Sequence, residues 1–172
     1  MEDVMRKILE KIDARFAEIR YMKIKNDHVV VKNGVVNAVS SILEEGFAIR
    51  VVNEGIGFAS TNDANKLEDI AKIAWKLSRK REKKVEFSEE KSYEDSWSVE
   101  EKKNIENMGL EDKIEYLMDI DKSLKAEMKM QMLRDKIIEK IYMNSEGSLI
   151  KARIPRVEYF YMMGVMENGN FE

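Results

Sequence analysis

The dipeptide Asn33-Gly34 lies between two strand-like segments, residues 28–32 and 35–41, and it restricts how this part of the chain can fold. A type I′ turn needs positive φ at both central residues, and Asn-Gly is the pair that adopts it most readily. Valine dominates both flanking segments, as is typical of strands. The pattern predicts an antiparallel hairpin.

A second Asn-Gly pair, Asn168-Gly169, follows a strand-like segment at residues 156–167, and the sequence stops three residues later at Glu172. On this pattern the last strand turns without a returning strand to pair with it. Natural proteins usually cover or blunt such an edge. We therefore expect these 172 residues to be the front part of a longer protein.

The other segments give an order of helix, strands, helices, strands. Helices are expected at residues 2–13 and 110–124. Another is expected to start at a Thr61-Asn62-Asp63 cap and to continue through an apolar stripe, Leu67–Leu77. A short one is expected to run from a capping box at residues 98–101 to about residue 107. Strands are expected at residues 16–25, 47–52, 56–59, 129–133, 137–143 and 148–152, with a turn at residues 144–147. The order predicts an α+β fold with a largely antiparallel, hairpin-built sheet and flanking helices.

Composition excludes several kinds of chemistry. The chain has no Cys and a single His, His28, so disulfides, thiolate ligands and a two-histidine metal site are excluded. Its 30 basic and 33 acidic residues are interspersed along the chain. A nucleic-acid-binding face normally shows a strong basic excess, so this balance argues against one. No apolar run approaches about 18 residues, and the N-terminus is acidic. We expect a cytoplasmic protein with no membrane contact.

Three motifs have a functional and a structural interpretation, and the structural one is favoured for each. Gly55-Ile56-Gly57 can cradle a phosphate, but it lacks the third glycine of a dinucleotide site and fits a tight hairpin better. The basic run at residues 79–84 fits a solvated helix C-terminus better than a nucleic-acid site. His28, with no nucleophile pattern nearby, fits an edge-strand residue better than a general base.

Arg50 differs because it stands in the middle of an otherwise apolar strand. A charge there must either reach solvent at an edge or pair with a carboxylate. Arg50 is therefore the most plausible single polar contact point.

Three segments in order resemble a known family. They are Glu45-Gly46-Phe47-Ala48-Ile49-Arg50-Val51-Val52, Gly57-Phe58-Ala59-Ser60-Thr61-Asn62-Asp63 and Asn144-Ser145-Glu146-Gly147. Together with the helix at residues 71–74 and the Ser98 helix start, they resemble the N-terminal domain of the TldD/PmbA family of metallopeptidases, also called modulators of DNA gyrase.

The resemblance implies one N-terminal domain over residues 1–172, with strands and helices at 1–82, a connector at 83–97, and helices and strands at 98–172. Zinc and the catalytic residues are implied for a C-terminal domain of the parent, with no cofactor in this chain. A homo- or heterodimer of the family would enclose unfolded peptide in a chamber that this domain helps to wall.

An extended peptide can add main-chain hydrogen bonds to an open strand. The residues expected to contact peptide are Gly46, Phe47, Arg50, Gly57 and Phe58, although ordinary sheet core explains the same residues. A stand-alone peptide-binding or scaffold protein, related to the non-catalytic subunit, is the alternative function. Nucleic-acid binding through residues 79–84 is a third.

Overall fold

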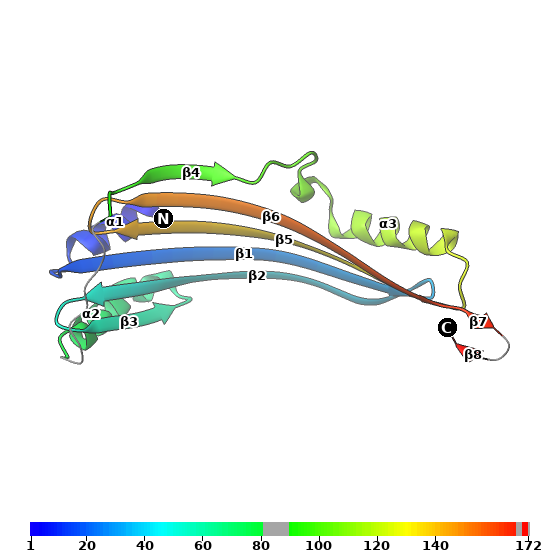
Figure 1. Cartoon of the computed structure of the whole chain (residues 1–172), viewed down its shortest axis with the longest axis horizontal. Helices are drawn as coiled ribbons and strands as arrows, with labels where there is room; N and C mark the ends of the chain where they lie inside the picture. The colour runs from blue at the N-terminus through cyan, green and yellow to red at the C-terminus, as the bar shows by residue number, and fades with distance from the viewer. Residues whose placement is uncertain (81–89, 168–169, 172) are drawn as a thin grey trace. The chain divides into compact units, whose positions relative to one another are not determined.

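The structure is a computed structural model that describes residues 1–80, 90–167 and 170–171. Within these residues, a six-stranded sheet has the order β3-β2-β1-β5-β6-β4. Its strands are β1 (Phe16–Lys32), β2 (Val35–Val52), β3 (Ile56–Thr61), β4 (Glu94–Ser98), β5 (Met128–Asn144) and β6 (Leu149–Gly164). The described helices are α1 (Glu2–Glu10), α2 (Leu67–Ser78) and α3 (Leu110–Ser123), with 3-10 turns η1 (Ala64–Lys66) and η2 (Ile105–Asn107) (Figure 1). The predicted α+β class is confirmed.

The sheet is mostly antiparallel. Strands β2 and β3 pair in opposite directions, and β1 runs opposite to β5 because Asn33 lies beside Lys129 while Ala17 lies beside Ser145. Strand β4 pairs in parallel with the start of β6. The sheet is therefore mixed.

Both predicted turns between long strands are confirmed. Asn33 has φ 49° and Gly34 has φ 72°, the two positive values of a type I′ turn. At the other turn, the Asn144 side chain accepts hydrogen bonds from the backbone amides of Glu146 and Ser148, and Gly147 has φ 94°. An Asx-type bond of this kind fixes the direction of the chain as it leaves β5.

The strands are longer than predicted. The separate strands expected at residues 16–25 and 28–32 are one strand, and the same holds for the pairs that form β2, β5 and β6. Pro155, in the gap between the two strands predicted within β6, lies just beyond the last residue paired with β4. A proline is tolerated there because β6 has become an edge strand. His28, expected at an edge, lies on β1, between β2 and β5.

The chain end also differs from the prediction. Strands β7 (Met166–Glu167) and β8 (Asn170–Phe171) pair in opposite directions, so a short returning strand is present where none was expected. The predicted turn itself, Asn168-Gly169, lies outside the described residues.

Two further predictions were wrong. Residues 94–97 were expected to be part of a loop, but they belong to β4; residues 83–89 of that segment lie outside the described residues. The helix expected to begin at Ser98 is absent from the described residues, where only the short turn η2 precedes Gly109. The Glu101 carboxylate accepts a hydrogen bond from the Ile105 amide, and Ser98 is the last residue of β4.

The chain divides into two compact units. Unit 1 contains Met1–Lys23, Glu44–Ser98 and Ile138–Arg153, and unit 2 contains Ile24–Leu43, Val99–Ile137 and Ile154–Glu172. In unit 1, α1 and α2 cover one face of the sheet. The buried residues of this core are Met5, Ile8, Leu9, Ala17, Ile19, Tyr21, Phe47, Ile49, Val51, Leu67, Ile70, Ala71, Ala74, Met143 and Leu149. Every second residue of β1 and β2 contributes, as expected for strands with one packed face.

In unit 2, α3 packs on the sheet through a smaller apolar cluster. Its buried members are Val29, Val31, Leu117 and Leu133. The amide of Gly109 donates to the Asp112 carboxylate at 2.8 Å, which closes the first turn of α3. An acidic residue at that position also complements the helix dipole.

Candidate functional site

The five residues expected to contact peptide lie on β2 and β3 of unit 1, but they do not share one environment. Phe47 is buried, and its ring centroid lies 4.9 Å from that of Tyr21. Gly57 is also buried: a Cβ built there would lie only 1.7 Å from the Ala74 carbonyl oxygen of α2. These two residues therefore pack the interior. Gly46 is half-buried, beside the Thr61 carbonyl.

Arg50 and Phe58 form the accessible part of the set. They are direct partners in the β2–β3 ladder, so their side chains lie next to each other on the same face of the sheet. Phe58 is 54% exposed, which is unusual for a large aromatic side chain. The pair is thus an aromatic ring beside a guanidinium group, on the face away from the core residues Ile49 and Val51.

Arg50 is paired with a carboxylate, the second of the two alternatives that the sequence left open. Its Nε lies 3.6 Å from Oε1 of Glu18, and Nη2 of Arg20 lies 3.0 Å from the same oxygen. Glu18 is only 5% exposed, whereas both arginine side chains remain open to solvent. Sequence reasoning missed Glu18 and Arg20. The alternation of Ala17, Ile19 and Tyr21, which face the core, is the signal that would have placed Glu18 and Arg20 together on the opposite face.

Tyr142 of β5 adds an aromatic ring to this cluster. The guanidinium carbon of Arg20 lies 5.5 Å from the ring centroid, within the range of a cation–π contact. The Asn144 side chain donates to the Tyr142 hydroxyl at 3.3 Å. Burial raises the pKa of the Tyr142 hydroxyl, and the nearby Glu18 carboxylate adds to the rise. The hydroxyl therefore stays protonated at neutral pH.

Strand β3 ends the described sheet on one side. Val52 pairs with Ile56, and the Asn53 amide donates to the Gly55 carbonyl around the turn. That bond identifies Val52–Ile56 as a pair that exchanges no hydrogen bonds. In an antiparallel ladder such pairs alternate with hydrogen-bonded pairs, so Arg50–Phe58 and Ala48–Ser60 are also pairs that exchange no hydrogen bonds. The amides and carbonyls of Ile56, Phe58 and Ser60 consequently point away from β2.

The Gly55-Ile56-Gly57 motif is a tight turn into a strand, as favoured. The Gly55 amide donates to the Ser78 carbonyl at 2.8 Å, and Gly57 allows β3 to approach α2 closely. Of the basic run, Arg79 and Lys80 follow the C-terminus of α2, and Arg79 lies over the Trp75 ring at 5.1 Å. Residues 81–84 lie outside the described residues.

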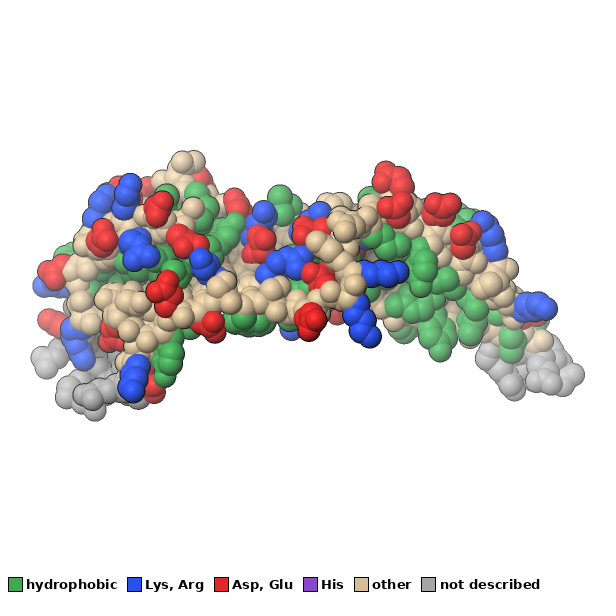
Figure 2. All heavy atoms as spheres, turned by 90° about the horizontal axis from the view of Figure 1, so that it is seen from above, with side chains coloured by type: hydrophobic (Ala, Val, Ile, Leu, Met, Phe, Trp, Pro, Cys, Tyr) green, Lys and Arg blue, Asp and Glu red, His purple; other side chains and the backbone are tan. Residues whose placement is uncertain are grey.

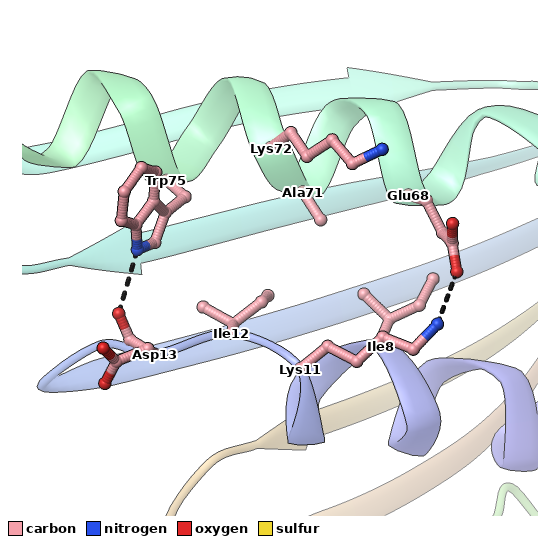
Figure 3. A pocket seen from close by; sticks show the side chains of 8 residues that line it. All are labelled: Ile8, Lys11, Ile12, Asp13, Glu68, Ala71, Lys72 and Trp75. Carbon is pink, nitrogen blue, oxygen red and sulfur yellow. Dashed lines mark hydrogen bonds and ion pairs between the residues drawn. The ribbon is translucent and has the colours of Figure 1, made fainter.

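A pocket of about 290 Å³ lies between α1 and α2 in unit 1 (Figure 3). Ile8, Ile12, Ala71 and Trp75 give it apolar walls. Two contacts bridge its sides: Trp75 Nε1 donates to the Asp13 carbonyl at 2.9 Å, and Lys11 donates to Glu68 at 2.7 Å. Both bridges are exposed, so they define the rim of the pocket.

The residues of this chain do not fit a zinc centre. His28 is the single histidine and there is no cysteine. Among the described residues, no group of three His, Asp or Glu side chains is arranged to hold a metal ion. The buried Nε2 of His28 has no hydrogen-bond partner among those residues.

Sequence profiles of one class of protein, the metallopeptidases, match most of the chain. The profile described as PmbA/TldA metallopeptidase domain 1 matches residues 17–78, and the PmbA/TldA metallopeptidase central domain matches residues 103–172. The chain belongs to the TldD/PmbA family, and the resemblance expected from the sequence is confirmed.

Individual relatives agree. The metalloprotease MJ0996 of Methanocaldococcus jannaschii is 28% identical over 177 residues, covering 96% of this chain and 39% of that protein. A Thermotoga maritima structure described as a modulator of a DNA gyrase has a TM-score of 0.76 at 15% identity, covering 99% of this chain and 41% of the other. TldE from Thermococcus kodakarensis has a TM-score of 0.72 at 14% identity, covering 99% and 40%.

These two structural similarities show the fold alone, because the identities are low. The chain spans about two fifths of the length of the relatives it matches. Among the described residues, no helix combines the length and the apolar character needed to cross a membrane.

Proposed function

We propose that this chain is the N-terminal, non-catalytic domain of a TldD/PmbA-type metallopeptidase and that it helps to enclose an unfolded peptide substrate. The zinc ion and the hydrolytic residues would lie in the remainder of the parent protein, since the donor set of this chain does not fit a zinc centre. A cytoplasmic location is part of the same proposal.

The observation that carries the proposal is the outer edge of β3, which pairs with no further strand among the described residues. Its outward amides and carbonyls belong to Ile56, Phe58 and Ser60, and the first two of these have large, exposed side chains. An extended peptide that adds to such an edge gains affinity from main-chain hydrogen bonds and needs little sequence specificity. Low specificity is what the degradation of unfolded peptides requires.

The dimerisation role is supported by an apolar surface in unit 2. In residues 157–163 of β6, large apolar side chains remain exposed on both faces of the strand: Val157, Tyr159, Tyr161 and Met163 alternate with Phe160 and Met162. Figure 2 shows hydrophobic side chains gathered on the surface near α3 and this part of β6. Neighbouring large apolar side chains exposed in this number usually mark a region that another protein part covers. We propose that the C-terminal domain or a family partner covers it.

The peptide-binding role is tested with a six-residue peptide of alternating threonine and valine. We expect it to bind the 172-residue chain and to bind at least about fivefold more weakly when alternate amides are N-methylated, because each lost hydrogen bond costs roughly 1 kcal/mol. Ser60→Pro removes one outward amide of β3 and should weaken binding similarly, whereas Ser60→Ala keeps that amide. Equal binding to Ser60→Pro and Ser60→Ala would contradict the proposal.

The alternative, a stand-alone peptide-binding or scaffold protein, predicts the same binding. The coding sequence after Glu172 separates the two functions: a reading frame that continues into a helix with two histidines supports the peptidase domain. A stop codon there, with no separately encoded metal-binding subunit, supports the scaffold.

A further inference from the structure

We propose that Arg20 and Arg50 form a carboxylate-binding site on the open sheet face of unit 1 and that it holds a carboxylate of the bound peptide. The inference rests on the proposed peptide-binding function, and it specifies which chemical group of the peptide unit 1 recognises.

The charges of the cluster do not balance. Both guanidinium groups contact a single oxygen, Oε1 of Glu18, so two positive charges share one negative charge. Among the described residues, no second acidic side chain lies within ion-pair distance of either arginine. The cluster therefore keeps about one unit of positive charge, and this attracts an anion.

The hydrogen-bonding capacity of the cluster is also unfilled. A guanidinium group has five N–H donors in a planar fork. Arg50 approaches Glu18 through Nε, and Arg20 approaches it through Nη2. Their other N–H groups lie on side chains that are 39% and 56% exposed, respectively. Those groups are free to bind a second, external oxyanion.

Glu18 acts as a positioning residue in this arrangement. A carboxylate that is 5% exposed is costly to bury, and a buried ion pair adds little net stability compared with apolar packing. Its clear effect is geometric, because one fixed oxygen holds two long side chains side by side. The Tyr142 ring supports Arg20 from β5. The two forks are thus oriented before a ligand arrives.

We assign a peptide carboxylate to the cluster because it lies on the same sheet face as the Phe58 side chain. Arg50 lies opposite Phe58, and Phe58 belongs to the β3 edge along which the peptide is proposed to lie. A planar carboxylate matches the guanidinium fork through two parallel hydrogen bonds. The exposed Phe58 ring adds an apolar contact for a neighbouring side chain. The carboxylate is either the C-terminus of the peptide or an aspartate or glutamate side chain.

The test compares forms of the threonine–valine peptide that differ in one group. The free acid should bind the 172-residue chain about tenfold more tightly than its C-terminal amide, because a charge-assisted hydrogen bond contributes about 1.5–3 kcal/mol. In Arg50→Gln the two forms should bind within about twofold of each other. Arg134→Gln is the matched control, since Arg134 also pairs with one glutamate at 3.4 Å and has a side chain that is 42% exposed. It should keep the full difference.

A third peptide, an amide with one internal glutamate, identifies the source of the carboxylate. If its affinity matches that of the free acid, the site accepts side-chain carboxylates; if it matches that of the plain amide, the site requires a C-terminus. Equal binding of all three forms to the unmodified chain would overturn the inference. It would leave the proposed function intact as long as N-methylation still weakens binding.

Failure of the strand-addition function can also be distinguished from failure of the carboxylate site. N-acetyl-phenylalanine and its amide are too short to add a strand, so they report on the arginines alone. The acid should shift the nuclear magnetic resonance signals of the Arg20 and Arg50 Nε–H groups, and the amide should not. Such shifts without binding of any longer peptide would support the carboxylate site and reject the strand-addition function. Absence of shifts, together with equal affinity of acid and amide peptides, rejects the site.

Discussion

Unit 1 and unit 2 are stabilised by different means. Unit 1 buries an apolar layer between its sheet and two helices, α1 and α2. Unit 2 has one described helix, α3, and a much smaller apolar cluster around Leu117. The hydrophobic contribution scales with buried apolar area, at about 25 cal/mol per Å². Unit 1 therefore has the larger share of hydrophobic stabilisation.

Unit 2 replaces part of that core with a buried polar network. Lys113 is 2% exposed, and its Nζ lies 2.7 Å from Asp27 and 2.8 Å from Asp135. The Ser41 hydroxyl donates to the second oxygen of Asp27 at 2.6 Å. Gln131 is fully buried and links the Leu117 carbonyl of α3 to the Tyr159 hydroxyl of β6.

The difference has a consequence for specificity. A helix that packs through apolar side chains alone can shift slightly on its sheet at little cost. A buried cation between two carboxylates keeps both ion pairs in one arrangement only. The network therefore fixes how α3 sits on its sheet, at the cost of sensitivity to any single change. Unit 2 also exposes apolar side chains on β6, so we expect its stability to depend more on additional protein than that of unit 1.

The largest effect is expected from Lys113→Met. The substitution leaves Asp27 and Asp135 buried without their cation, and removing one partner of a buried ion pair costs about 3–5 kcal/mol. Hydrogen exchange should show lost protection in α3 and residues 128–137, while α1 and α2 stay protected. Lys122→Met is the control because its pair with Asp119 is exposed. Equal loss of protection in both units would contradict the comparison.

Gly57→Ala should have the next largest effect, and in unit 1. The added Cβ overlaps the Ala74 carbonyl of α2, and forcing extra atoms into a packed site costs roughly 1–3 kcal/mol. At Gly46 the nearest atom to an added Cβ is 3.5 Å away, so Gly46→Ala should change stability by no more than about 0.5 kcal/mol. Urea denaturation measures both variants. Similar midpoints would mean that β3 and α2 are not packed as described.

Changes of pH should weaken unit 2 from both sides. Burial raises the pKa of Asp27, but hydrogen bonds from Lys113 and Ser41 outweigh it, so the net pKa is lowered. Burial lowers the pKa of Lys113, but its bonds to Asp135 and Asp27 outweigh it, so the net pKa is raised. The Asp27 contribution is present above the unfolded-state pKa and is lost as pH falls through the lowered value. The Lys113 contribution is present below its unfolded-state pKa and is lost as pH rises through the raised value.

Thermal melting followed from about pH 2 to about pH 12 checks these directions. That range extends beyond the ordinary pKa values of Asp, about 3.9, and Lys, about 10.4. Asp27→Asn should flatten the acid side of the stability profile. An unchanged acid side in that variant would show that Asp27 does not contribute through its charge.

Tyr159→Phe should have the smallest effect. It removes the hydroxyl that donates to Gln131 at 2.7 Å and leaves a buried amide oxygen without that donor. The expected cost is about 1 kcal/mol. Tyr161→Phe alters the stacked neighbour and should have no measurable effect on the midpoint of chemical denaturation. An equal loss of stability in the two variants would show that the hydrogen bond between Tyr159 and Gln131 does not stabilise unit 2.

Local signals predicted the turns and most of the packed face of α2, although Leu77, expected in its buried stripe, is 38% exposed. Asn33-Gly34 and the turn after Asn144 need only their own side chains and φ values, so a short sequence window contains the information. The apolar stripe of α2 repeats at helical spacing and was predicted for the same reason.

The full length of the strands was not predictable in this way. Asp27 and Asp135 lie in the gaps between the strands that were predicted within β1 and β5, and Ser41 is the last residue of the strand that was predicted at residues 35–41 of β2. They are tolerated inside the strands because Lys113, far along the chain, forms ion pairs with Asp27 and Asp135, and Asp27 accepts a hydrogen bond from Ser41. A sequence window around each residue does not contain its partner.

The candidate site shows the same limit. Arg50 was predicted either to reach solvent at an edge or to pair with a carboxylate, but its partner Glu18 comes from another strand, and Tyr142 comes from a third. Phe47 and Gly57 were selected with Arg50 from neighbouring sequence, yet they face the core. Proximity in sequence did not distinguish the two faces of the sheet, which alternate from one residue to the next.

The most direct test of the account is amide hydrogen exchange of the 172-residue chain with and without saturating threonine–valine peptide. Strand addition predicts new protection at the amides of Ile56, Phe58 and Ser60, whose N–H groups point away from β2, with no change at Gly57 and Ala59. Protection that appears only on other strands, with β3 unchanged, would contradict the claim that β3 is the peptide-binding edge.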